Sequence, residues 1–380
     1  MIYWVVSLEL RKVELYEIWV RLKEEFETSF GKTIERPAIL VRVEEKSGEE
    51  GWGECVAGEG PWYSYETWET AWHILNEFIV PKVLEKEDID IDGYENLVSK
   101  IRGHNMAKAS LEMSLWDLEA KLRGVPLWRL LGGKNRHILS GVSIGIQKSV
   151  DGLIKKVGDF LEKGYKRIKI KIRPGYDLEP ISRIRNEYGY DLPLQVDANS
   201  AYRIEDLDVF RKIDNYALLM IEQPLHYKDL VDHAELARHI KTPICLDESI
   251  EDVNDARKAY YLGSAMIINI KPGRVGGLRE TLKIHDFWYS VANRPVWIGG
   301  MLETGIGRGH LVAAATLPGV KYPSDISASD KYFEKDIVEP EWVLNKDGTI
   351  TAPERPGIGV EVLFDEIKKN IKRSKVFSRA

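Results

Sequence analysis

The 380-residue chain has few cysteines, no long apolar run and no excess of positive charge. Its two cysteines, Cys55 and Cys245, are too few and too far apart for a disulfide framework or a metal knuckle, so we expect a reducing, cytoplasmic setting. Charged residues interrupt the apolar residues of 1–20, which excludes a signal peptide or a membrane span there. The net charge of −6 and the lack of a Lys/Arg cluster argue against a nucleic-acid partner.

The first part of the chain has strand-like segments followed by helical ones. "PAILVRVEE" and "EGWGECV" are typical of strands, with a turn at "KSGEEG" between them. "MAKASLEMSLWDLEAKLRG" is helical and stops at Gly124, shortly before Pro126. Strands first and helices afterwards predict an α+β domain, over about residues 1–130.

From about residue 140 the pattern changes to short apolar strands that alternate with helix-length segments. Landmark residues near the strand ends are Lys171, Asp197, Glu222, Asp247 and Lys271, at intervals of 24 to 26 residues. One strand, one helix and two loops fill such an interval, so the repeat predicts a parallel (β/α)₇β barrel of the TIM type over residues 131–325. A doubly wound open sheet is the alternative, but "GIGRGH" has the wrong spacing for its phosphate-binding turn.

The strand "RIKIKI" places Lys169 and Lys171 on one face and three isoleucines on the other. In an isolated amphipathic strand the lysine face would more often point to water. Barrel helices cover the outer face of every strand, however, so the isoleucines should contact helices. We therefore expect both lysines to point into the barrel, near its carboxyl-terminal mouth.

Three successive strands end in carboxylates, at Asp197 in "QVDAN", Glu222 in "IEQP" and Asp247 in "LDES". A single acid at a strand end would usually cap a helix or form an ion pair. Three on adjoining barrel strands would converge and repel one another, unless a divalent cation lay between them. Oxygen ligands without His or Cys favour Mg²⁺, with Mn²⁺ as a substitute.

Lysines flank these carboxylates along the chain. Lys169 and Lys171 lie one strand before them, and Lys271 in "NIKPGRVGG" lies one strand after them. A substrate carboxylate bound at the cation would then have a lysine on each face. Removal of a proton from the carbon beside that carboxylate needs such a base and nearby positive charge.

Taken together, "KIK", "VDAN", "IEQP", "LDES" and "IKPGRVGG" resemble the muconate-lactonising subgroup of the enolase superfamily, for which this use of lysine and Mg²⁺ is described. The His–Asp pair of the mandelate-racemase-like subgroup has no counterpart near "RPVWIGG". "FETSFG", "GWGECVAGEGPWYS" and "GGMLETGIGR" resemble the family of o-succinylbenzoate synthases that are also N-succinylamino acid racemases. The resemblance implies that residues 1–130 cap the barrel and that residues 326–380 return to this cap.

The same resemblance implies the roles of individual residues. Lys171 and Lys271 would be the acid/base pair, Lys169 would give electrostatic support, and Asp197, Glu222 and Asp247 would bind Mg²⁺. The expected substrate-binding residues are Phe26, Phe30, Tyr63, Ser143, Asn199, Arg274 and Met301. Some of them lie on cap loops that would form a lid. The resemblance associates Arg274, the arginine of "KPGR", with racemase competence.

The expected reaction is Mg²⁺-assisted removal of the α-proton of a small carboxylate. Two outcomes share this step: racemisation of N-acyl, especially N-succinyl, amino acids, and dehydration to o-succinylbenzoate for menaquinone synthesis. A dedicated synthase, a dipeptide epimerase, a muconate cycloisomerase, a Schiff-base aldolase built on a barrel lysine and a non-catalytic metabolite-binding barrel remain alternatives. The resemblance also implies a homo-oligomer, either a dimer or an octamer.

Overall fold

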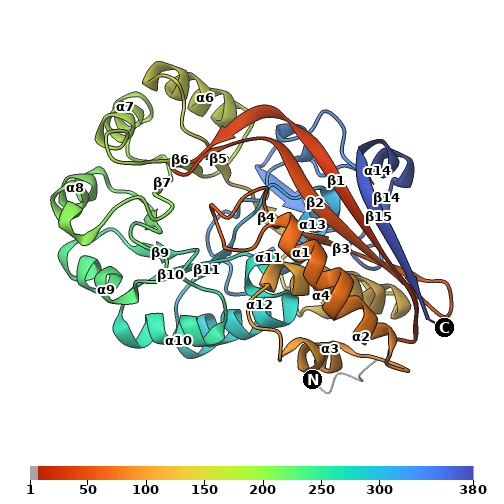
Figure 1. Cartoon of the computed structure of the whole chain (residues 1–380). Helices are drawn as coiled ribbons and strands as arrows, with labels where there is room; N and C mark the ends of the chain where they lie inside the picture. The colour runs from red at the N-terminus through yellow and green to blue at the C-terminus, as the bar shows by residue number, and fades with distance from the viewer. Residues whose placement is uncertain (1–6, 380) are drawn as a thin grey trace.

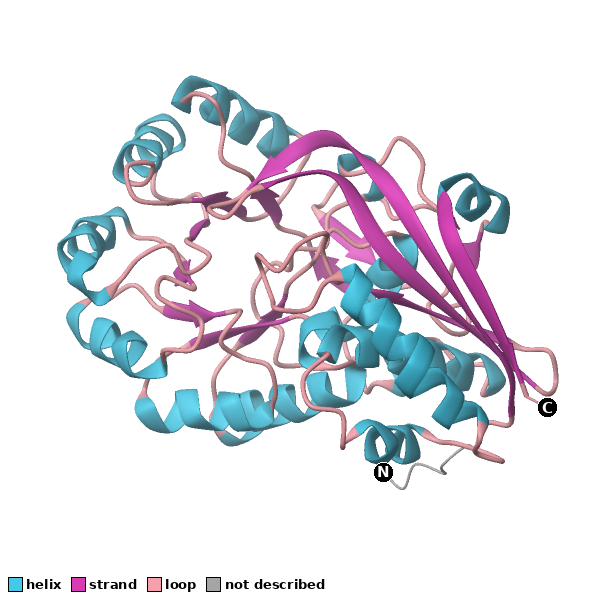
Figure 2. Ribbon diagram, viewed as in Figure 1, coloured by secondary structure: helices cyan, strands magenta, loops and turns pink. Residues whose placement is uncertain are grey.

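The structure is a computed structural model that describes residues 7–379 (Figure 1). An antiparallel sheet with its helices lies against a barrel of parallel strands and outer helices (Figures 1 and 2). No helix within the described residues has both the length and the apolar character needed to cross a membrane.

The antiparallel sheet has four strands in the order β15-β1-β2-β3. They are β1 (Leu10–Glu27), β2 (Lys32–Glu45), β3 (Glu50–Cys55) and β15 (Ile371–Ser378). The β1–β2 hairpin curves over the barrel (Figure 1). β15 pairs with β1 in a register that runs from Lys12↔Ser378 to Ile18↔Ile371, so the end of the chain completes the sheet formed by its beginning.

Six helical segments between residues 68 and 130 lie beside this sheet, some packed on its strands and some on one another. They are α1 (Trp68–Ile74), η1 (Leu75–Ile79), α2 (Val80–Leu84), α3 (Ile91–Val98), α4 (Asn105–Leu122) and the short α5 (Leu127–Leu130). Most residues of α4 are buried, polar ones included. It fits closely against β3 because Gly53 has no side chain: a Cβ atom there would lie 1.9 Å from the Ser110 carbonyl oxygen. The predicted stop at Gly124 is correct, since Gly124 has a positive φ of 66° just after the helix.

The seven predicted barrel segments form one parallel sheet in chain order. Its strands are β5 (Val142–Ile144), β6 (Ile168–Lys171), β7 (Leu194–Asp197), β8 (Met220–Glu222), β9 (Ile244–Leu246), β10 (Ile267–Ile270) and β11 (Val296–Ile298). Helices surround it (Figure 2): α6 (Val150–Glu162), α7 (Leu178–Tyr188), α8 (Leu207–Ile213), α9 (Leu230–His239), α10 (Val253–Leu262), α11 (Pro272–Val275), α12 (Leu278–His285), η4 (Asp286–Val291) and α13 (Gly305–Ala315). Strands covered on both faces are mostly apolar, so the polar residues within these strands, such as Lys169 and Gln195, need polar partners inside the barrel.

Residues 320–325 occupy the eighth position of the barrel. They make parallel bridges to β11 (Val296↔Val320) and to the start of β5 (Ser140↔Ser324). The Asp325 amide donates to the Ile298 carbonyl at 2.9 Å. The predicted barrel with its capping domain is thus confirmed, with isolated bridges where a regular eighth strand was expected; the domain boundaries stay a prediction.

The remaining elements are short. They are β4 (His137–Leu139), which pairs with β13 (Thr349–Thr351), β12 (Val338–Glu339), which pairs with β14 (Glu361–Val362), the turns η2 (Ile204–Asp206), η3 (Asp214–Tyr216) and η5 (Ser329–Lys331), and α14 (Phe364–Asn370).

A buried carboxylate joins the two parts of the molecule. Glu54 of β3 accepts hydrogen bonds from the amide and hydroxyl of Thr304 and from the Gly307 amide, all at the start of α13. It also pairs with Arg36 of β2 at 2.7 Å, and both side chains are almost fully buried. The contact therefore holds the cap sheet against the loop that follows β11.

Replacing Glu54 by glutamine removes this charge but keeps the shape of the side chain. We expect the free energy of unfolding to fall by about 3–5 kcal/mol, because the Arg36 guanidinium is left buried without its ion-pair partner. Urea unfolding measures the loss. The matched control is Glu50→Gln on the same strand, whose pair with Arg42 is partly exposed and should contribute less than about 1 kcal/mol. A smaller loss for Glu54→Gln than for this control would contradict the prediction.

Candidate active site

The two lysines of β6 point into the barrel, as predicted. Lys169 Nζ lies 2.9 Å from a Glu222 oxygen and 2.6 Å from an Asp325 oxygen. Lys171 Nζ lies 2.6 Å from Asp197 Oδ2. The isoleucines that alternate with them are buried on the helix side, so both faces of this charged strand are covered.

The three predicted carboxylates meet at the carboxyl ends of β7, β8 and β9. Asp197, Glu222 and Asp247 are buried, and each offers an oxygen within 4.8 Å of the others. Burial and the neighbouring Asp197 raise the pKa of Glu222 to about 8. Burial opposes the charge of Asp247 too, but Lys271 and Arg274 hold its pKa below the usual value. Three hard oxygen donors at this separation fit one divalent cation.

Lys171 is oriented by the side chains next to it. Its Nζ donates to Asn199 Oδ1 at 2.8 Å as well as to Asp197. The Asn199 amide nitrogen in turn donates to Glu248 Oε1 at 2.9 Å. Asn199 has a positive φ of 43°, a conformation that asparagine tolerates better than most residues. The loop after β7 therefore fixes the position of this amine.

Lys271 lies on the other side of the carboxylates. Its Nζ is 2.7 Å from Asp247 Oδ2, 3.2 Å from the Tyr63 hydroxyl and 4.6 Å from the centre of the Tyr63 ring. Burial disfavours its charge, but Asp247 raises its pKa above the usual range. In the sheet, Lys171 ends β6 and Lys271 follows β10, with the three carboxylate-bearing strands between them.

Three polar residues that the sequence analysis missed complete the contacts of this site. Gln195 and Asn269 each donate an amide hydrogen to Glu222 at 2.7 Å. Each stands on a strand two residues before a predicted site residue, Asp197 at the end of β7 or Lys271 just after β10, so strand alternation could have revealed them. Asp325 contacts Lys169, Arg167 and Ser143. No sequence signal marked Asp325, because the segment that carries it lacks a strand pattern.

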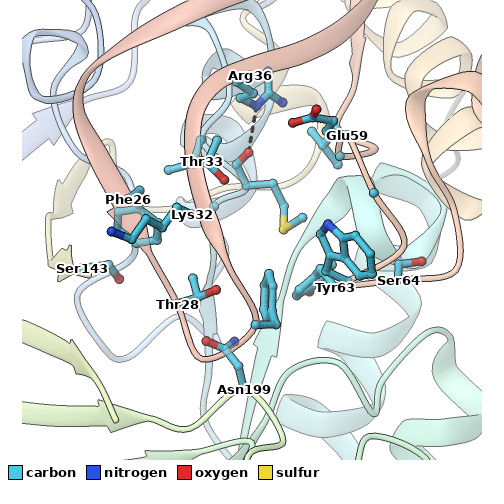
Figure 3. Close-up of a pocket in the computed structure, with 18 of the residues that line it drawn as sticks. Phe26, Thr28, Lys32, Thr33, Arg36, Glu59, Tyr63, Ser64, Ser143 and Asn199 are labelled. Atoms are coloured by element: carbon cyan, nitrogen blue, oxygen red, sulfur yellow. Dashed lines mark hydrogen bonds between the residues drawn. The ribbon is translucent and has the colours of Figure 1, made fainter. Parts of the chain in front are cut away.

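A pocket opens above these side chains and extends to the cap. It is lined by the three lysines and by six of the predicted substrate-binding residues: Phe26, Phe30, Tyr63, Ser143, Asn199 and Met301. Figure 3 shows cap residues such as Arg36 and Glu59 at one end and Asn199 at the other.

Arg274, the seventh predicted residue, lies behind Asp247 outside this lining. Its side chain bonds to an Asp247 oxygen and to the carbonyls of Ile250 and Asn269. It approaches the Tyr63 hydroxyl at 3.4 Å. Any effect of Arg274 on a substrate must therefore pass through Asp247, Tyr63 and Lys271.

The fold is a parallel barrel under a cap that both ends of the chain form. Lysines and carboxylates lie at the carboxyl ends of the barrel strands. Together these features define a class of capped barrel enzymes. Residues 152–367 match the family described as enolase C-terminal domain-like, and residues 11–132 match the mandelate racemase/muconate lactonizing enzyme N-terminal domain. The chain belongs to the enolase superfamily.

Relatives with known names match over almost their full length. The o-succinylbenzoate synthase of Geobacillus stearothermophilus is 46% identical over 98% of this chain and 99% of its own. The N-succinylamino acid racemase of an Amycolatopsis species is 44% identical over 95% of this chain and 98% of its own. A solved enolase-superfamily structure from Listeria innocua superposes with a TM-score of 0.94 at 37% identity, covering 98% of this chain and all of that one.

Proposed function

We propose that the chain is an N-succinylamino acid racemase that also has o-succinylbenzoate synthase activity. Relatives bearing each of these names are similar to it at almost equal identity, 44% and 46%. The two reactions begin in the same way, with removal of the proton on the carbon next to a carboxylate. One set of side chains can therefore serve both.

The observation that carries the proposal is the position of Lys171 and Lys271 on opposite flanks of the carboxylate cluster. Lys171 contacts Asp197 at one end of the cluster and Lys271 contacts Asp247 at the other. A racemase needs a base on each face of the reacting carbon, whereas a one-directional enzyme needs only one. Two buried lysines in this arrangement supply both.

A cation held by the carboxylates would offset the charge of Asp247 that raises the pKa of Lys271. In the proposed racemisation, the neutral amine of one lysine then removes the α-proton and the ammonium of the other returns a proton to the opposite face. Lys171 Nζ serves one enantiomer as the base and Lys271 Nζ serves the other. Lys169, held as an ammonium beside Glu222 and Asp325, places positive charge where the carboxylate becomes more negative. Asn199 and Tyr63 orient the two working lysines.

In the proposed synthase reaction, Lys171 Nζ removes the α-proton and then gives it to the departing hydroxyl group, which leaves as water. Lys271 remains an ammonium beside the cyclohexadiene ring of the substrate. A cation held by Asp197, Glu222 and Asp247, which we propose is Mg²⁺ because the donors are all carboxylates, would supply further charge to stabilise the substrate carboxylate. The cap residues Phe26, Phe30 and Tyr63 line this space.

The test is proton exchange in deuterated water with Mg²⁺ present. Each enantiomer of N-succinylphenylalanine should lose its α-proton signal in the NMR spectrum and give the racemate by polarimetry. In a separate assay of the synthase reaction, the enzyme should dehydrate the hydroxylated cyclohexadiene that is the precursor of o-succinylbenzoate. Exchange with dipeptides alone would favour an epimerase instead, and trapping of a ketone substrate by borohydride would favour the aldolase. No exchange with any of these carboxylates would overturn the proposal.

A further inference from the structure

The two relatives' names share one group, a succinyl chain, which ends in a second carboxylate. If the proposed function is correct, that carboxylate needs a partner away from the cation site. Besides Lys156, whose Nζ is paired with Glu24 at 2.7 Å, three cationic side chains of the described residues lie in or beside the cap end of the pocket: Lys32, Arg36 and Lys331. Their surroundings differ in a way that selects one of them.

Lys32 and Arg36 already have carboxylate partners. Lys32 Nζ lies 3.2 Å from Glu27 and 3.7 Å from Glu25. Arg36 is paired with the buried Glu54 and also donates to the Met301 carbonyl, the bond drawn in Figure 3. Both cations are therefore engaged in holding the hairpin and the loop after β11.

Lys331 has a different environment. Within residues 7–379 it forms no ion pair with a carboxylate, and its Nζ donates to the Ser143 carbonyl at 3.0 Å. Three aromatic rings surround the ammonium, with ring centres 4.2 Å away for Tyr332, 5.5 Å for Phe26 and 5.9 Å for Phe160. Lys331 is half-buried, and this cage leaves its ammonium without a negative charge in contact.

The charges around Lys331 give the same picture. Burial lowers the pKa of Lys331 to about 7, although Asp325 acts in the opposite direction. Of the more distant charges, Arg308 and Lys156 lower this pKa and Glu24 raises it. Asp325 is not in contact with Lys331 as an ion pair, and it is already paired with Lys169 and Arg167. A carboxylate that reached Lys331 would restore the balance of charge.

Lys331 lines a small side chamber next to the main pocket. The chamber and the pocket share three lining residues, Phe26, Ser143 and Tyr332. Figure 3 draws Phe26 and Ser143 on the same side of the pocket. Backbone hydrogen bonds position the residues near this junction: the Lys23 amide donates to the Tyr332 carbonyl and the Ile146 amide donates to the Glu27 carbonyl.

We propose that Lys331 binds the carboxylate at the far end of the N-succinyl group, so that the enzyme selects acyl groups that end in a negative charge. The path from the reacting centre is short: Lys169 contacts Asp325, Asp325 accepts from Ser143, and the carbonyl of Ser143 accepts from Lys331. The two carboxylates of an extended N-succinylamino acid are separated by roughly 7 Å, from ordinary bond lengths.

The experiment compares two substrates of equal length. One is N-succinylphenylalanine, and the other carries a primary amide in place of the distal carboxylate. For the Lys331→Met enzyme, kcat/KM for the succinyl substrate should fall by about 10- to 100-fold, the effect of losing one charge-assisted hydrogen bond. The amide substrate should change much less. Lys331→Arg should keep most of the preference for the charged substrate.

The control variant is Lys163→Met. Lys163 also lies over the Phe160 ring, at 5.6 Å, but on its exposed side, so the substitution should leave the ratio between the two substrates unchanged. Equal losses on both substrates in Lys331→Met would mean a structural role only and would overturn the inference. If kcat/KM for both substrates stayed the same in Lys331→Met, the inference would be overturned as well, while the proposed racemase activity still stood. If the unaltered enzyme exchanged neither substrate, the proposed function itself would fail.

Discussion

Alanine in place of Lys171 should abolish both proposed reactions. The Lys171 amine is the proposed base of the synthase and one of the two proposed bases of the racemase, and a positioned base contributes about 10²- to 10⁴-fold to the rate. Its removal also leaves Asp197 and Asn199 without the ammonium that they contact. We expect racemisation, followed by polarimetry, and synthesis of o-succinylbenzoate, followed by absorbance, both to fall by at least about a hundredfold.

Exchange in deuterated water separates the two lysines. In Lys271→Arg, a base is lost on one face but the positive charge beside Asp247 is kept. One enantiomer should therefore stop exchanging its α-proton, while the other continues through Lys171. The synthase reaction, in which Lys271 acts only as a cation, should be weakened less than racemisation.

A matched control is Lys155→Ala, an exposed lysine on α6, which should leave both reactions intact. If both enantiomers still exchanged in Lys271→Arg, Lys271 would not be the second base. If o-succinylbenzoate still formed at the full rate in Lys171→Ala, the mechanism would be wrong for the synthase.

The barrel could be predicted because its physical requirements appear directly in the sequence. Strands covered by helices must be apolar, so a charged residue such as Lys169, Asp197 or Glu222 within or at the end of one stands out. Equal spacing of these residues then indicates the repeating strand–helix unit. Six of the seven predicted substrate-binding residues also line the pocket, and they came from the resemblance to a family rather than from spacing.

Contacts between distant segments could not be predicted in this way. Asp325 lies in a stretch without alternation, and only the closure of the barrel brings it beside Lys169 and Ser143. Arg274 was expected at the substrate, but its long side chain turns back to Asp247 and to two backbone carbonyls. Lys331 has no local pattern around it at all. Each of these positions depends on how loops cross the barrel mouth, which local periodicity does not encode.

Removal of divalent cations should abolish activity reversibly. The buried oxygens of Asp197, Glu222 and Asp247 fit one cation, and the substrate carboxylate would be held beside it. Dialysis against EDTA should therefore eliminate racemisation and synthesis, and Mg²⁺ should restore them. Binding that is confined to the folded state also stabilises it: Mg²⁺ at 100 times its Kd should raise the free energy of unfolding by about 2.7 kcal/mol.

Paired variants locate this effect in the cluster. Glu222→Gln removes the negative charge of one of the three carboxylates. It should eliminate the activity, and it should also eliminate the stabilisation by Mg²⁺, which is measured as a shift in Tm. Glu248→Gln is the control for stabilisation: Glu248 is another buried carboxylate nearby, and its contact is with Asn199, so the Tm shift should persist. Activity that survived in EDTA would contradict the role of the cation. A Tm response that disappeared in Glu248→Gln but remained in Glu222→Gln would place the cation elsewhere, because only Glu222 belongs to the cluster whose oxygens converge.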